Sequence, residues 1–162
     1  MRKIAMLLMT LALVACGNKP IVHKSGSFVF DDGFTDSFSS QTGIYHRLNC
    51  HDRHRPFAAH IRLTDAEISS ILSIADDIDF YHLPKNVVGI SGDEKREVIA
   101  PCAGYRLRIE SGSLKNEVMW DCGYSGPEES PKQIAPLVSR IMEILQSKPE
   151  VHGLEKSGCM FM

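Results

Sequence analysis

The sequence of 162 residues lacks the short motifs that most often identify an activity. It contains neither an HExxH motif nor paired CxxC motifs, which are common zinc-binding patterns. It contains no GxSxG motif, the pattern that places a nucleophilic serine in the α/β-hydrolases. Lysine and arginine form no cluster that would follow a phosphate backbone, and the formal net charge is −2. The sequence therefore predicts no nucleic-acid partner and no cofactor.

The N-terminal apolar segment is too short to cross a membrane. Residues 4–15, IAMLLMTLALVA, follow the positive residues Arg2 and Lys3. As a helix this segment would rise about 18 Å, whereas the hydrocarbon core of a bilayer is about 30 Å thick. The pattern predicts a secretory signal peptide over residues 1–15 instead of a membrane span.

The residues that follow resemble the lipobox of bacterial lipoproteins, which ends in an obligatory cysteine. The matching residues are Leu13-Val14-Ala15-Cys16. The resemblance implies that Cys16 is diacylated on sulfur, that the chain is cut before it, and that the new amino group is acylated. Several acyl chains anchor a protein far more firmly than one chain does. Under enterobacterial sorting, Gly17 after the cysteine implies the outer membrane, with the domain facing the periplasm.

Cysteine usage agrees with export. Besides Cys16 the chain has four cysteines, and an even number in an exported protein predicts disulfides. The hairpin described below favours a bridge between Cys102 and Cys122. Cys50 and Cys159 would then form the remaining pair.

Beyond the predicted signal peptide, composition divides the chain into three parts. Residues 16–26 are polar and predict a tether, residues 27–147 predict a single domain, and residues 148–162 predict a loose C-terminal tail that begins near Pro149. Removal of residues 1–15 changes the formal net charge to −4 and leaves 147 residues, enough for one domain with a hydrophobic core.

Two helices are expected from capping boxes followed by apolar stripes at steps of three and four residues. Thr64 with Glu67 opens the first, which runs to about residue 79. Ser130 with Gln133 opens the second, over residues 131–147. Short alternating segments at residues 28–30, 34–39, 44–49 and 57–64 predict strands, and residues 85–98 an exposed loop.

A hairpin is expected between residues 105–110 and 115–122, with Val118 and Trp120 facing inward. If Glu110 faces Lys115, the same register places Cys102 within one step of Cys122, so a small bulge would allow a disulfide. Together these elements predict an α+β fold, a mostly antiparallel sheet with two amphipathic helices packed on one face.

The order of these elements resembles the emfourin-type domain, a small protein inhibitor of a thermolysin-like metalloprotease. The resemblance rests on FVFDDGF near residue 30, IDFYHLP at the end of the first helix, the hairpin YRLRIESG…NEVMWDC, and the final PKQIAPLVSRI segment. It covers most of residues 27–147 and implies a fold more than an activity.

The stretch HRLNCHDRH at residues 46–54 is the main candidate for metal chemistry. His46 and Cys50 would lie about 13 Å apart on a strand, too far to share one ion. The better-placed ligand set is His51, Asp52 and His54 on a loop with His60 on the next strand. The alternative is a solvated turn that happens to be rich in histidine.

The sequence supports catalytic arrangements less well than it supports a metal site. Cys50 and His51 are adjacent and would point to opposite faces of a strand, and Asp76, Asp77 and Asp79 resemble a solvated helix end. Trp120 is expected in the core, and the loops at 31–42, 51–56 and 85–98 are the exposed surfaces available for contact.

The sequence predicts a membrane-anchored, non-enzymatic lipoprotein that binds another envelope protein. The alternatives are a periplasmic metal-binding module and an inhibitor of an extracytoplasmic metalloprotease.

Overall fold

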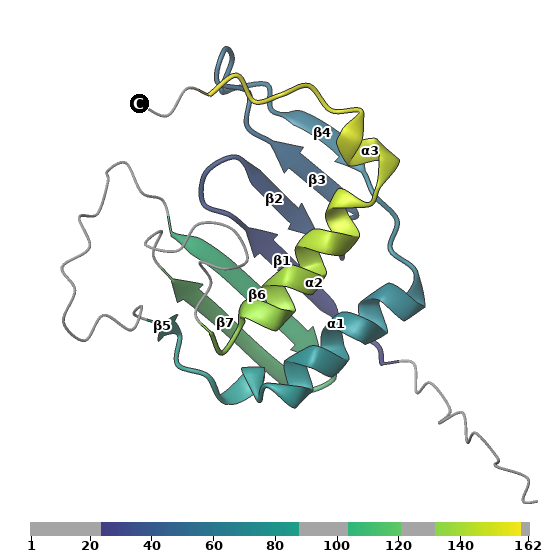
Figure 1. Cartoon of the computed structure of the whole chain (residues 1–162), viewed down its shortest axis with the longest axis vertical. Coiled ribbons are helices and arrows are strands. Elements are labelled where there is room, and N and C mark those ends of the chain that lie inside the picture. Colours follow the sequence, from purple (N-terminus) through teal and green to yellow (C-terminus); the bar gives the residue numbers. More distant parts are fainter. Residues whose placement is uncertain (1–23, 88–103, 121–131, 160–162) are drawn as a thin grey trace, which may run out of the picture.

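The computed structural model describes residues 24–87, 104–120 and 132–159, which form an α+β fold around one sheet (Figure 1). Seven strands lie in the order β4-β3-β2-β1-β6-β7-β5. They are β1 Ser27–Asp31, β2 Asp36–Ser39, β3 Ile44–Arg47, β4 Phe57–His60, β5 Asn86–Val87, β6 Tyr105–Ser111 and β7 Leu114–Trp120. All neighbours are antiparallel except β5, which pairs parallel with β7. The predicted class, a mostly antiparallel α+β fold, is confirmed.

Two of the connections join neighbouring antiparallel strands by short turns. The β1–β2 turn is organised by Asp32, whose Oδ1 accepts hydrogen bonds from the amides of Phe34, Thr35 and Asp36 at 2.8–2.9 Å. The β6–β7 hairpin has the predicted register, with Glu110 opposite Lys115. Cys102 and Cys122 lie outside the described residues.

The first helix follows its capping box closely. Helix α1 spans Asp65–Asp77, and Thr64 caps it by accepting from the Glu67 amide while the Glu67 carboxylate accepts from the Thr64 amide. A short 3-10 helix, η1, follows at Phe80–His82. In this segment Phe80 is fully buried, so the end of the helix is fixed to the core as well as its start.

The last part of the chain differs from the sequence-based expectation. Helix α2 spans Ala135–Gln146 with Ile134 as its N-cap, so the predicted start at residue 131 is about four residues too early. Ile134 is fully buried, and burying its side chain in the core sets the helix start instead of a side-chain cap. Residues after Lys148 form a short helix, α3, at Pro149–His152.

The core lies between the sheet and the helices. Figure 1 shows α1 and α2 side by side in front of the sheet, and the Arg140 guanidinium on α2 donates to the Ser70 hydroxyl on α1 at 3.2 Å. Alternate strand residues point into this core, as the pairing of Phe30 with both Phe38 and Leu107 illustrates. The strand residues with at most 5 % exposure are Phe28, Phe30, Phe38, Tyr45, Leu107, Ile109, Val118 and Trp120.

The segment expected to be a tether is partly docked. The Lys24 amide donates to the Ser69 hydroxyl at 3.0 Å, and its ammonium pairs with Asp76 on α1. A side chain at Gly26 would place its Cβ 2.4 Å from the Glu110 carbonyl oxygen, so only glycine allows this approach. Residues 24–26 therefore belong to the domain, and the chain enters it beside α1.

Candidate functional site: a disulfide-bonded basic loop

The connection between β3 and β4, residues 48–56, contains Cys50 and three of the four predicted metal ligands, His51, Asp52 and His54. The predicted strand over 44–49 ends at Arg47 because Asn49 turns the chain. The Asn49 side-chain oxygen accepts from the amides of His51 and Asp52 at 3.0 and 3.2 Å, and its amide group donates to the Arg55 carbonyl at 3.2 Å. One asparagine thus joins both ends of the loop, a common way for this side chain to stabilise a turn.

Asp52 completes the internal bonding of the loop. Its carboxylate accepts from the His54 amide at 3.1 Å, and its carbonyl accepts from the Arg55 amide at 3.0 Å. These bonds hold residues 52–55 in a fixed turn. One oxygen of the Asp52 carboxylate is thus bonded to the backbone of its own loop.

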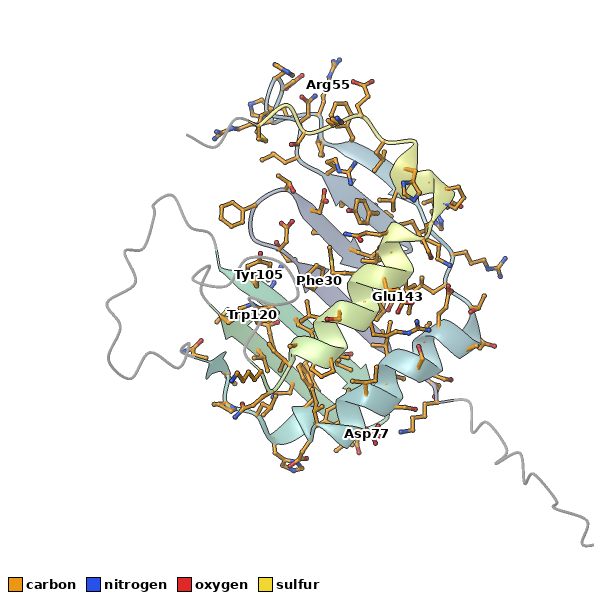
Figure 2. The ribbon with its side chains drawn as sticks, viewed as in Figure 1. Phe30, Arg55, Asp77, Tyr105, Trp120 and Glu143 are labelled. Carbon is orange, nitrogen blue, oxygen red and sulfur yellow. A yellow bond between two sulfur atoms is a disulfide. The ribbon has the colours of Figure 1, made fainter. Side chains whose placement is uncertain are left out.

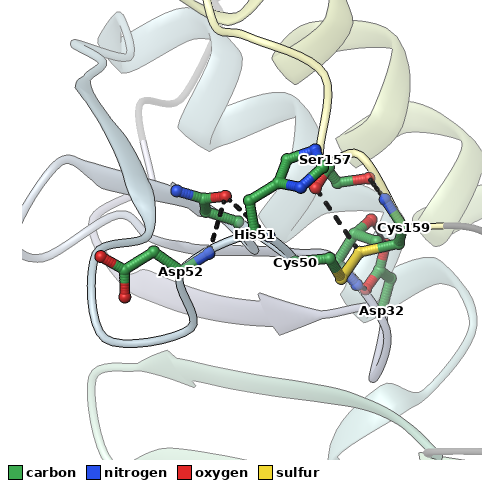
Figure 3. Close-up of a disulfide and its surroundings, with 8 residues drawn as sticks. Asp32, Cys50, His51, Asp52, Ser157 and Cys159 are labelled. Carbon is green, nitrogen blue, oxygen red and sulfur yellow. Dashed lines mark hydrogen bonds between the residues drawn. A yellow bond between two sulfur atoms is a disulfide. The ribbon is translucent and has the colours of Figure 1, made fainter.

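The loop is also joined covalently to the C-terminal end of the described chain. Cys50 and Cys159 form a disulfide, and the Cys50 amide donates to the Ser157 carbonyl at 2.9 Å (Figure 3). The expected remaining pair is thus present. The expectation of a loose tail over 148–162 does not hold for residues 148–159, because α3 folds back on the body and buries Val151 to 5 % exposure.

His51 packs against this C-terminal segment. A Cβ at Gly158 would lie 2.6 Å from the Nε2 atom of His51, and Gly158 has a φ of +66°. Both the close approach and the left-handed backbone favour glycine at this position. Figure 3 shows the His51 ring on the same side of the loop as Ser157 and Cys159, so the ring faces the C-terminal segment.

The predicted metal ligands do not come together. His60 lies opposite Ile44, three residues along β4 from the loop, which is about 10 Å at the usual rise per strand residue. Its ring lies over Gly43, where a Cβ would be 2.9 Å from the His60 Cε1 atom. His51 faces Gly158, Asp52 bonds its own loop, and His54 is exposed. Across residues 24–87, 104–120 and 132–159, no group of three or more His, Cys, Asp or Glu side chains could hold a metal ion.

The disulfide at Cys50 also leaves this residue without the free thiol that a nucleophile needs. A disulfide sulfur is not a thiolate, and the thiolate is the reactive and metal-binding form of cysteine. In this oxidised structure Cys50 therefore has a structural role at the base of the loop.

A partly buried ion pair lies next to the loop, between the start of β2 and the end of β3. The Arg47 Nε donates to Asp36 at 3.0 Å, and the same guanidinium donates to the Tyr45 hydroxyl at 3.3 Å. Burial raises the pKa of Tyr45 above its ordinary value, and the Asp36 carboxylate raises it further. The hydrogen bond to Asp36 raises the pKa of Arg47 as well. Arg47 is thus neutralised locally and forms no part of the exposed charge of the loop.

The exposed cations of the loop are the feature that the sequence-based prediction missed. The Arg55 side chain is 87 % exposed and its Nε lies 3.9 Å from Asp52, a distance at which an exposed pair contributes little. Arg53 is exposed and has no carboxylate partner in the part of the chain that the structure describes. Figure 2 shows Arg55 at one end of the molecule, pointing outward. The signal available in the sequence was two arginines, Arg53 and Arg55, following a single acidic residue, Asp52.

Other arginines of the sheet and of α2 are paired. Arg106 lies 3.3 Å from Asp31, Arg140 lies 2.7 Å from Glu143, and Arg108 bonds Glu110. Arg53 and Arg55 differ from these three arginines in having no strong partner among the described residues.

Two further expectations concern the core and the anchor. Trp120 is 3 % exposed and stacks on Tyr105 with ring centroids 5.2 Å apart, so its predicted core position is confirmed. Cys16 lies outside the described residues. Among the described helices, none is both long and apolar enough to span a bilayer.

Comparison with known proteins adds no relative. No family model, no curated protein and no solved structure matches the chain. The resemblance to the emfourin-type domain stays a prediction.

Proposed function

We propose that the protein is a lipid-anchored lipoprotein of the bacterial cell envelope, with a non-enzymatic domain that binds another protein. The observation that carries the proposal is the sequence Leu13-Val14-Ala15-Cys16, preceded by a positive pair and a short apolar segment. Acylated Cys16 would attach the domain to the outer membrane on its periplasmic side.

The position of the docked N-terminal residues supports an anchor of short reach. Eight residues, 16–23, separate the acylated cysteine from Lys24, which is bonded to Ser69 and Asp76 on α1. Eight fully extended residues span at most about 28 Å. The α1 end of the domain would therefore remain close to the membrane.

The proposed packing leaves two kinds of surface for a partner. In it, α1 and α2 cover one face of the sheet, and no other described helix covers the opposite face. The loop at residues 48–56 is the better contact surface, because its backbone is fixed by hydrogen bonds and by the Cys50–Cys159 disulfide. A preformed loop loses less conformational entropy when it binds a partner than a flexible one does.

Replacement of Cys16 tests the anchor. The Cys16→Ser variant should lose acyl labelling and move from the membrane to the soluble fraction of a bacterial host. The Ala15→Gly variant is the matched control, because it keeps a small residue before Cys16 and should remain in the membrane. Unchanged membrane association of Cys16→Ser would overturn the proposed anchor.

A further inference from the structure

Charge is distributed unevenly along the length of the domain. Figure 2, drawn with the longest axis vertical, shows Arg55 at one end and Asp77 at the other. The end near Asp77 also holds Asp76 and Asp79, which are both exposed, and the last turn of α1 contains no basic residue. Asp79 lies 2.6 Å from the Nδ1 atom of His82. Lys24 pairs with Asp76, so the chain enters the domain at this acidic end.

In the proposed anchored state the tether enters the domain at the acidic end, which is therefore the end nearest to the bilayer. The charge of a bilayer surface acts over roughly one Debye length, about 8 Å at physiological ionic strength. A compact domain of this size measures about 40 Å across. The basic loop at the opposite end therefore lies well outside the electrostatic range of the membrane when the acidic end is nearest to it.

The opposite end presents cations on a rigid support. Arg53, His54 and Arg55 are exposed. One oxygen of the Asp52 carboxylate accepts from the His54 amide, and the other lies 3.9 Å from the Arg55 Nε. The disulfide and the Asn49 hydrogen bonds fix the backbone that carries them. Arginine is enriched at protein–protein interfaces, where its planar group can bond carboxylates in pairs.

We propose that residues 51–55, the basic loop, form the contact surface for an acidic patch on another envelope protein. This inference rests on the proposed function, and it adds the binding surface and the chemistry of the partner. The partner approaches the end of the domain that faces away from the anchoring membrane. Complementary charge guides the encounter, and the fixed loop sets the geometry of the contact.

Site-specific photo-crosslinking in intact cells tests this proposal on the full chain. Benzoylphenylalanine is placed at His54 in the basic loop or at Ser113 in the β6–β7 turn, which is also exposed. The expected result is one discrete protein adduct from position 54 that is absent from position 113. An adduct to phospholipid alone at position 54, or the same adduct from both positions, would overturn the proposal.

Charge variants then test the chemistry of the contact. Arg53→Glu with Arg55→Glu should lower the yield of the position-54 adduct by about tenfold or more. Arg62→Glu with Lys85→Glu is the matched control: it makes the same change in net charge at exposed residues outside the loop and should alter the yield by less than about twofold. Equal yields in the two double variants would contradict an electrostatic contact at the loop.

Identification of the crosslinked protein allows a charge-swap test. Replacing its crosslinked acidic residues with lysine should restore the adduct to the Arg53→Glu, Arg55→Glu variant. Failure to restore it, or a partner peptide without acidic residues, would count against an acidic patch. The two proposals fail separately, because membrane association is measured with Cys16→Ser and the contact is measured at position 54.

Discussion

The disulfide between Cys50 and Cys159 joins two residues that are 109 positions apart in the sequence. Cys50 lies at the base of the basic loop, and Cys159 follows α3 near the end of the described chain. The bond therefore fixes the C-terminal segment against the connection between β3 and β4, where the Cys50 amide also donates to Ser157.

Removing this bond should destabilise the domain. For Cys50→Ser with Cys159→Ser, we expect the free energy of unfolding to fall by about 2–5 kcal/mol, because the unfolded chain gains the freedom of a long loop. Urea unfolding followed by tryptophan fluorescence measures the change. A double variant as stable as the parent protein would contradict the structural role of the bond.

The register of the β6–β7 hairpin supports a second disulfide. Glu110 lies opposite Lys115 as the sequence predicted, and continuing that register along the chain would bring Cys102 within one step of Cys122. Peptide mapping without reduction should recover a Cys102–Cys122 linked peptide alongside the Cys50–Cys159 one. Free thiols at both Cys102 and Cys122 would show that the hairpin argument is wrong.

Gly43 provides a test of the connection between β2 and β3. It has a φ of +69°, and a Cβ there would lie 2.9 Å from both the Ile61 carbonyl and the His60 ring. Gly43→Ala should lower the free energy of unfolding more than Gly112→Ala, which also has positive φ, at +58°, but nothing within 4 Å of the added Cβ. We expect about 1–2 kcal/mol for the backbone strain alone at each site, with the steric cost added only at Gly43. Equal losses, measured by urea unfolding, would contradict the close approach of His60 and Ile61 to Gly43.

Lys148 and Glu67 give the domain an acid-sensitive contact between α1 and the start of α3. The ammonium lies 2.7 Å from the carboxylate. Burial raises the pKa of Glu67, but hydrogen bonds from Lys148 and Thr64 outweigh burial and lower it overall. A lowered pKa means that the stabilisation is present at neutral pH and is lost as pH falls through the folded-state pKa.

The variant Glu67→Gln isolates this charge, because glutamine can still complete the capping box with Thr64. It should be less stable than the parent protein at pH 7, with the difference shrinking as pH falls below about 4. Urea unfolding over a pH series measures the difference. A constant difference across that range would refute a contribution from the ionised carboxylate.

The elements that could be predicted from the sequence are those specified by local signals. The capping box at Thr64, the alternation in β6 and β7, and the hairpin register depend on residues close together in the chain. The early end of β3 and the late start of α2 were missed, because the first depends on an Asn49 side chain that bonds across its loop and the second on burial of Ile134. Tertiary contacts outweigh local preference at both positions.

The features of the candidate site also separate into those that the sequence predicted and those that it did not. The cysteine count and the hairpin register predicted the Cys50–Cys159 pair. The separation of His60 from the loop was not predicted, because it depends on how far β4 extends away from the loop. Whether Arg53 and Arg55 find a partner depends on how the loop places Asp52, which bonds its own backbone and lies 3.9 Å from the Arg55 Nε. Such competition between neighbouring groups is visible only once the backbone is in place.

The mass of the N-terminal peptide tests the central claim, the lipid anchor, most directly. The protein is produced in a bacterial host that processes lipoproteins, extracted from membranes, digested and measured by mass spectrometry. The account predicts a peptide that begins at Cys16 and carries a diacylglyceryl group on its sulfur. A chain that begins at Met1, or a Cys16 with a free thiol, would contradict it.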